Sequence, residues 1–190
     1  DRVICLSDLR LDIPGVAVVP LKHGWPGWWS KMELFRPDVV PGFEDGAFLV
    51  YSDLDNVFMR DASLLGELEG PVFLEELTHP GRLSSALMAF AEGSLTRIYS
   101  RFAQDPERWM APGSCGGVPN TVHGDQVVIE HFLREAGIGF DFFQDFDPGI
   151  AERYHPYRHD TAPVVCFMGP SKPHKALPGI VRKTWESYGT

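Results

Sequence analysis

An apolar run that ends in two aspartates is the feature of this sequence that most constrains its fold. Residues 47–51 (AFLVY) are apolar without a break, and residues 52–56 (SDLDN) follow directly. An uninterrupted run of this length is typical of a central strand that is buried on both faces. Because open α/β sheets bind ligands at the carboxyl ends of their strands, we expect Asp53 and Asp55 at a ligand site.

Other strand-like and helix-like segments alternate along the chain. Strands are predicted at residues 3–6, 16–19, 72–74, 86–90 and 164–167, and a short apolar run lies at 57–59. Helices are predicted at residues 31–35, with Ser30 as the N-cap, and at 95–102 and 126–136. This alternation predicts an α/β fold with a mainly parallel, doubly wound sheet that is flanked by helices. We interpret residues 1–190 as a single domain.

Charge and composition argue against several classes of protein. The chain has 190 residues and a net charge of −9, and its 17 Lys and Arg form no basic stripe, so we expect no nucleic-acid partner. No apolar run approaches the roughly 18 residues of a membrane helix, so no transmembrane segment is predicted. The three cysteines lack a CxxC spacing, which fits a reducing compartment and predicts a cytoplasmic location.

The acidic pair has a chemical and a purely structural interpretation. In the turn that leaves a strand, the side chains of Asp53 and Asp55 can converge on one divalent cation. Carboxylate oxygens favour Mg²⁺ or Mn²⁺, and such ions keep positions open for phosphate oxygens. Alternatively, the two aspartates cap the turn and solvate the end of the strand.

Five short motifs resemble those of GT-A-fold glycosyltransferases and follow one another in the same order. They are residues 29–35 (WSKMELF), 48–55 (FLVYSDLD), 84–90 (SSALMAF), 124–126 (GDQ) and 169–174 (GPSKPH). The chain is similar to family 8 glycosyltransferases and their bacterial relatives over residues 3–174. This resemblance implies a GT-A-like fold whose first strand precedes Val3, and hence a domain that is N-terminally incomplete.

The resemblance also implies an activity, which is transfer of a hexosyl unit from a nucleotide-sugar to a sugar or other hydroxyl acceptor. The donor would be a UDP-sugar, or with less support a GDP-sugar, and the anomeric configuration would be retained. Asp53 and Asp55 would bind Mn²⁺ or Mg²⁺ against the donor diphosphate. Lys172, in the terminal motif that begins at Gly169, would add positive charge to the same phosphates. Alternatively, Lys172 is an ordinary solvated lysine of a loop.

Five further residues receive roles from the resemblance. Asp125 and Gln126 would face the donor sugar, with Gln126 near its reacting face. Ser84 or Ser85 would hydrogen-bond the sugar. Lys31 would contact the donor or stabilise the acidic site.

Each of these assignments competes with an ordinary structural role. Asp125 could be the N-cap of the helix that follows it, and Lys31 could pair with Glu33 or Asp53. Trp25, Trp28 and Trp29 are interpreted as a packed corner, with a platform for a sugar as the alternative. His155, His159 and His174 are interpreted as ordinary surface or loop histidines, with a position facing the metal as the alternative for one of them. The Gly- and Pro-rich residues 106–123 are a candidate lid on the acceptor side.

Two alternative functions remain open, and two departures from the family pattern, the missing first strand and a missing His, favour the first of them. Where the family carries a metal-binding His, this chain has residues 166–169 (CFMG), so a non-catalytic, glycosyltransferase-like binding domain is possible. The second alternative is a haloacid-dehalogenase-like phosphatase, with Asp53 as nucleophile and Asp55 as general acid–base. That fold needs a later acidic pair, for which Asp145 and Asp147 are the candidates.

Overall fold

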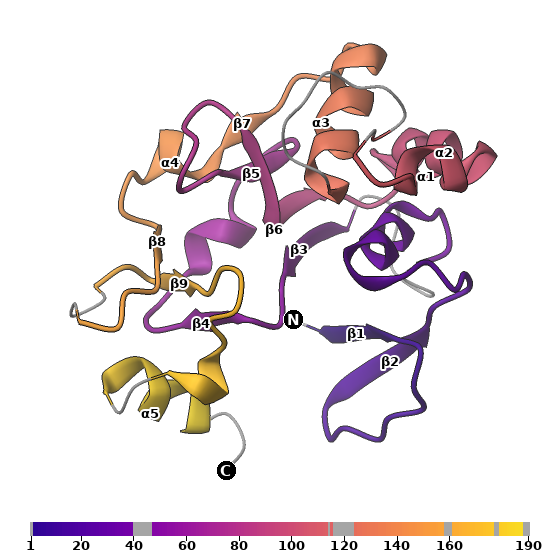
Figure 1. Ribbon diagram of the computed structural model, residues 1–190. Helices are drawn as coiled ribbons and strands as arrows, with labels where there is room; N and C mark the ends of the chain where they lie inside the picture. Colours follow the sequence, from indigo (N-terminus) through magenta and orange to yellow (C-terminus); the bar gives the residue numbers. More distant parts are fainter. Residues whose placement is uncertain are drawn as a thin grey trace. The chain divides into compact units, whose positions relative to one another are not determined.

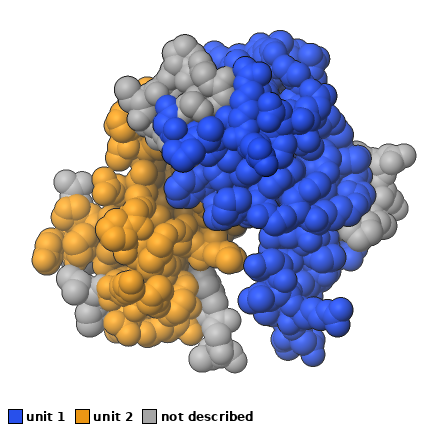
Figure 2. Space-filling model, turned by 45° about the vertical axis from the view of Figure 1, so that its right-hand side comes forward, with its two compact units in different colours: residues 1–47, 91–139 blue, residues 48–90, 140–190 orange. Residues whose placement is uncertain are grey.

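The computed structural model describes residues 2–39, 47–113, 115, 124–157, 161–176 and 179–187. The fold is mixed α/β, with sheets of parallel and antiparallel strands that are flanked by helices (Figure 1). The chain divides into two compact units, each made of two separate stretches (Figure 2). Unit 1 comprises residues 1–47 and 91–139, and unit 2 comprises residues 48–90 and 140–190.

Unit 1 combines a small parallel sheet with a group of helices. Its elements are β1 (Val3–Ser7), β2 (Val16–Pro20), the 3₁₀ helix η1 (Gly27–Phe35), α1 (Thr96–Gln104), α2 (Pro106–Met110) and α3 (Asp125–Ala136). β1 pairs with β2 in parallel, with Val3 opposite Val16. The helix η1 packs against α1 and α3, and the rings of Trp29 and Phe102 stack with their centroids 5.6 Å apart. Aromatic packing therefore joins the predicted helices of this unit.

The two helix starts in unit 1 differ from the sequence prediction. Ser30 lies inside η1, which begins three residues earlier at Gly27, and its hydroxyl donates to the Gly27 carbonyl at 2.8 Å. Asp125 is the first residue of α3, and Gly124 occupies the N-cap position. The predicted N-cap roles of both residues are therefore wrong. A carboxylate in the first turn, such as that of Asp125, still interacts favourably with the helix dipole.

Unit 2 contains most of the strands. Its elements are β3 (Phe48–Ser52), β4 (Asn56–Phe58), η2 (Ser63–Gly66), β5 (Val72–Glu75), β6 (Leu83–Ala91), β7 (Asp141–Phe142), α4 (Phe143–Phe146), β8 (Ala151–Arg153), β9 (Val164–Cys166), η4 (Pro173–Lys175) and α5 (Ile180–Ser187). One sheet has the order β3-β6-β5-β7 and another has the order β4-β9-β8. None of the helices in the described ranges is long and apolar enough to cross a membrane.

Strand directions in unit 2 are mixed, whereas a mainly parallel sheet was predicted. β5 runs antiparallel to β6 and parallel to β7, and β9 runs antiparallel to β4 and parallel to β8. Residues 76–82 connect β5 to β6. So short a connection allows an antiparallel pair, since parallel neighbours need a crossover of about a dozen residues or more.

The strand before the acidic pair is an edge strand, so the prediction of burial on both faces is wrong. β3 stands at the end of its sheet, none of its residues is fully buried, and the side chain of Val50 is 43% exposed. Its neighbour β6 is the deeply buried strand. An apolar run of strand length fits either position, and only the pairing of the strands decides between them.

β9 divides the interior of unit 2 into two hydrophobic clusters. Val164 and Cys166 pack in one cluster with residues of β5 and β6, while Val165 packs in the other with residues of β4 and α5. Alternate residues of a strand point to opposite faces, which explains this division. The chain that leaves β9 is thereby anchored on both sides before it reaches residues 169–174.

Candidate functional site

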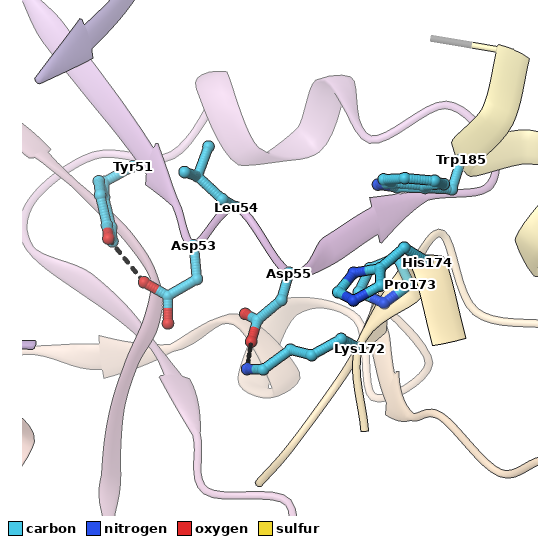
Figure 3. Close-up of a pocket in the computed structure, with 8 residues that line it drawn as sticks. All are labelled: Tyr51, Asp53, Leu54, Asp55, Lys172, Pro173, His174 and Trp185. Carbon is cyan, nitrogen blue, oxygen red and sulfur yellow. Dashed lines mark hydrogen bonds and ion pairs between the residues drawn. The ribbon is translucent and has the colours of Figure 1, made fainter. Parts of the chain in front are cut away.

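A pocket of about 440 Å³ in unit 2 contains the acidic pair. The turn after β3 forms one wall, and η4 with α5 forms the other (Figure 3). The lining residues are Tyr51, Asp53, Leu54, Asp55, Lys172, Pro173, His174 and Trp185. Two of the sequence motifs, residues 48–55 and 169–174, therefore meet at one site.

A tight turn carries the two aspartates. The Asp53 amide donates to the Ala86 carbonyl at 2.9 Å, and the Asn56 amide donates to the Asp53 carbonyl at 3.1 Å. At the tip of the turn, the side chain of Leu54 is 93% exposed. The carboxylates extend to one side of the turn and Leu54 to the other (Figure 3). Both carboxylates line one pocket, and their convergence on one divalent cation stays a prediction.

Each carboxylate has a partner in the pocket wall. The Tyr51 hydroxyl donates to Asp53 Oδ1 at 2.6 Å. Residues two apart in an extended strand share a face, so the spacing of Tyr51 and Asp53 could have predicted this contact. The Lys172 ammonium pairs with Asp55 Oδ2 at 2.5 Å, and the two side chains are 40% and 25% exposed. The interpretation of Lys172 as a merely solvated lysine is therefore wrong.

The pocket fits a hard cation that shares its coordination with a ligand. Mg²⁺ commonly binds through one or two carboxylates together with waters and substrate phosphates. Asp53 and Asp55 provide two carboxylates beside open space. Within the described ranges, no group of three His, Cys, Asp or Glu side chains is arranged to hold a metal ion. Two carboxylates beside open space could hold such a cation together with waters or a ligand.

Cys166 replaces the expected histidine and is a poor ligand for such a cation. The residue is buried, and this burial, with the nearby Asp53, Asp55 and Glu76 carboxylates, raises the pKa of its thiol to about 12. The thiol is therefore neutral near pH 7. Glu76, which the sequence analysis missed, is a buried third carboxylate. Its charge also contributes to the raised pKa of the Cys166 thiol.

The terminal motif positions Lys172 through local backbone geometry. Gly169 has φ +63, a left-handed conformation that favours glycine, and it redirects the chain after β9. Pro173 is the buried first residue of η4. His174 was interpreted as an ordinary histidine, yet it lines the pocket, as does Trp185 from α5. No motif in the sequence pointed to Trp185, because it lies beyond the last of them.

Three other predicted site residues lie together in unit 1. Lys31 pairs with Asp125 at 3.5 Å, and both side chains are largely buried. The partly buried Gln126 follows Asp125 in α3. Glu33, one predicted partner of Lys31, instead pairs with Arg36. Lys31 and Asp125 thus form a buried ion pair at the start of α3.

Ser84 and Ser85 are buried in β6. The Ser84 hydroxyl accepts a hydrogen bond from the Ala86 amide at 3.4 Å. Neither serine is among the lining residues of the pocket in the part of the chain that the structure describes. Their contact with a donor sugar stays a prediction.

The acidic pair required by the phosphatase hypothesis serves local turns. Asp145 accepts from the Phe142 amide at 2.9 Å, and Asp147 accepts from the Gly149 amide at 2.8 Å. Neither aspartate lines the pocket as far as the described residues define it. The described residues therefore do not bring this second acidic pair to the pocket of Asp53.

The remaining predictions have mixed outcomes. Trp29 is buried and Trp25 stacks on His23 with ring centroids 4.1 Å apart, as expected for a packed corner, whereas Trp28 is half exposed. His155 is exposed. His159 and, within the candidate lid, residues 114 and 116–123 lie outside the described residues.

Comparison with models of known protein families gave no match for this chain, and no curated protein matched its sequence. A function must therefore be inferred from the pocket and from the residues that form it.

Proposed function

We propose that this chain is a metal-dependent glycosyltransferase that transfers a hexosyl unit from a UDP-sugar to a hydroxyl group of an acceptor. The ion pair between Lys172 and Asp55 carries the proposal. These residues belong to separate motifs, lie 117 positions apart in the sequence, and meet at 2.5 Å in one pocket. Each motif is weak evidence by itself, and their convergence supports a shared ligand.

The residues of unit 2 would bind the diphosphate of the donor. Asp53 and Asp55 would hold Mn²⁺ or Mg²⁺, which supplies neutralisation of the charge that develops on the leaving nucleoside diphosphate. Lys172 would exchange its contact with Asp55 for phosphate oxygens, to which an ammonium donates strong, charge-assisted hydrogen bonds. The Tyr51 hydroxyl would hold the Asp53 carboxylate in a fixed orientation through its 2.6 Å hydrogen bond.

Within unit 1, the resemblance to GT-A-fold glycosyltransferases assigns Asp125 and Gln126 to hydroxyl groups of a hexose, with retention at the anomeric carbon. Lys31 would orient Asp125 through their ion pair. A buried carboxylate that already has a cationic partner needs little rearrangement to accept hydrogen bonds from a ligand, which is the advantage of a preorganised site.

The first test is calorimetric titration of UDP into the protein with and without Mn²⁺. We expect binding that depends on Mn²⁺ and that is lost in Asp53→Ala and in Asp55→Ala. Glu69→Ala is the matched control, because Glu69 is an exposed acid of unit 2 that lies outside the pocket lining. Absence of UDP binding by the wild-type protein under both conditions would refute the proposal.

A second assay separates the competing functions. Release of UDP from UDP-sugars in the presence of simple sugar acceptors would support transfer. Metal-dependent UDP binding without any product in a broad acceptor screen would support a non-catalytic binding domain instead. Release of inorganic phosphate from a phosphomonoester would support the phosphatase, and it should then require Asp53.

A further inference from the structure

Asn56, the residue after the acidic motif, connects the turn to the neighbouring strand. It is only 7% exposed. Its side-chain nitrogen donates to the Ala86 carbonyl at 2.8 Å and to the Ser52 hydroxyl oxygen at 3.1 Å. A single buried amide group therefore bridges β6 and the last residue of β3.

The same acceptor also holds the first aspartate. The Ala86 carbonyl accepts from the Asp53 amide at 2.9 Å in addition to the Asn56 side chain. The Asp53 carbonyl in turn accepts from the Asn56 amide at 3.1 Å and from the Ser52 hydroxyl at 3.2 Å. These bonds close the turn on itself and attach it to β6, which is the most deeply buried strand of its sheet.

The side-chain nitrogen of Asn56, and not its oxygen, makes the hydrogen bonds at this position. Among the described residues, Asn56 Oδ1 is the one buried side-chain nitrogen or oxygen that has no hydrogen-bond partner. An unpaired buried acceptor is unfavourable, and an apolar side chain of similar shape would avoid it. The two hydrogen bonds donated by the amide offset that disadvantage.

We propose that Asn56 is a positioning residue for the cation site, because it fixes the turn so that both carboxylates face one pocket. The inference rests on the proposed function for the identity of the ligand. Asp53 and Asp55 lie where the chain leaves β3 and turns, so the alternation of an extended strand no longer sets the direction of their side chains, and the closure of the turn does. The turn closed by Asn56 brings both carboxylates to the same side (Figure 3).

The test compares Asn56→Leu with wild type in two measurements. Titration of Mn²⁺ in the presence of UDP, followed by the electron paramagnetic resonance signal of free Mn²⁺, should show binding at least about tenfold weaker in the variant. Hydrogen exchange should be faster at the amides of Asp53 and Asn56, both of which are bonded within the turn network.

Gln144→Leu is the matched control, because Gln144 makes a comparable clamp elsewhere in unit 2. Its side chain accepts from the Glu75 amide at 2.9 Å and donates to the Glu75 carbonyl at 3.0 Å. We expect this variant to lose stability and to keep the Mn²⁺ affinity of wild type. Ser52→Ala is a milder second variant, which serves as the test if Asn56→Leu does not fold. It should weaken Mn²⁺ binding by a few-fold.

The outcomes separate this inference from the proposed function. Wild-type affinity for Mn²⁺ in Asn56→Leu, or in Ser52→Ala where only that variant folds, overturns the positioning role alone. The same holds if Gln144→Leu loses as much affinity as Asn56→Leu. A wild-type protein that binds no Mn²⁺ with UDP overturns the proposed function and this inference together.

Discussion

Substitution of Lys172 by Met should change the affinities for metal and nucleotide in opposite directions. In the free protein, the Lys172 ammonium pairs with Asp55 at 2.5 Å and so competes with a cation for that carboxylate. In the nucleotide complex, the same ammonium would donate to phosphate. A single substitution therefore removes a competitor of the metal and a ligand of the phosphate.

The size of each effect follows from the exposure of the pair. Lys172 and Asp55 are 40% and 25% exposed, so solvent screens their interaction, and such pairs contribute about 0.2–1 kcal/mol. Removal of Lys172 should thus raise the affinity for Mn²⁺ alone by about 1.5- to 5-fold. Loss of a charge-assisted hydrogen bond to phosphate costs about 1.5–3 kcal/mol. At saturating Mn²⁺ the metal already occupies its site, so UDP should bind about 10- to 150-fold more weakly.

The assay is calorimetric titration of Mn²⁺ alone, and then of UDP at saturating Mn²⁺, into wild type and Lys172→Met. Lys175→Met is the control, since Lys175 ends the 3₁₀ helix η4 that Lys172 directly precedes, is exposed, and does not line the pocket. Weaker binding of Mn²⁺ alone to Lys172→Met would refute the reasoning, because it would mean that Lys172 supports the metal site instead of competing for it. Equal UDP affinities would refute the phosphate contact.

Two further predictions concern the interior of each unit. Glu33→Ala should lower the free energy of unfolding by about 3 kcal/mol, because it leaves the buried Arg36 with only the half-exposed Asp38 as a partner; urea denaturation measures this, and a loss below about 1 kcal/mol would contradict it. With Ellman's reagent at pH 8, the partly exposed Cys5 should react fast in the native protein, and the buried Cys115 and Cys166 slowly. The pKa of Cys166 is raised to about 12, so its thiolate should form only as the pH approaches that value, and three fast thiols at pH 8 would contradict its burial.

Local patterns in the sequence predicted where several of the elements lie, although α2 (Pro106–Met110) falls in residues 106–123, which were predicted as a loop. The helix predicted at 126–136 is observed as Asp125–Ala136, and the strand predicted at 164–167 as Val164–Cys166. The acidic pair does follow a strand. These features depend on apolar periodicity and on local punctuation by Gly and Pro, which a single segment of chain contains.

The tertiary structure alone decided which segments meet. An apolar run does not distinguish the edge strand β3 from the central strand β6. The position of a strand in its sheet depends on the strands with which it pairs, and those lie elsewhere in the sequence. The contact between Lys172 and Asp55 joins residues 117 positions apart, and Trp185 reaches the pocket from a helix outside every motif. The sequence therefore determined several of the elements and the place of the acidic pair after a strand, whereas the assembled pocket depends on long-range packing that no local pattern records.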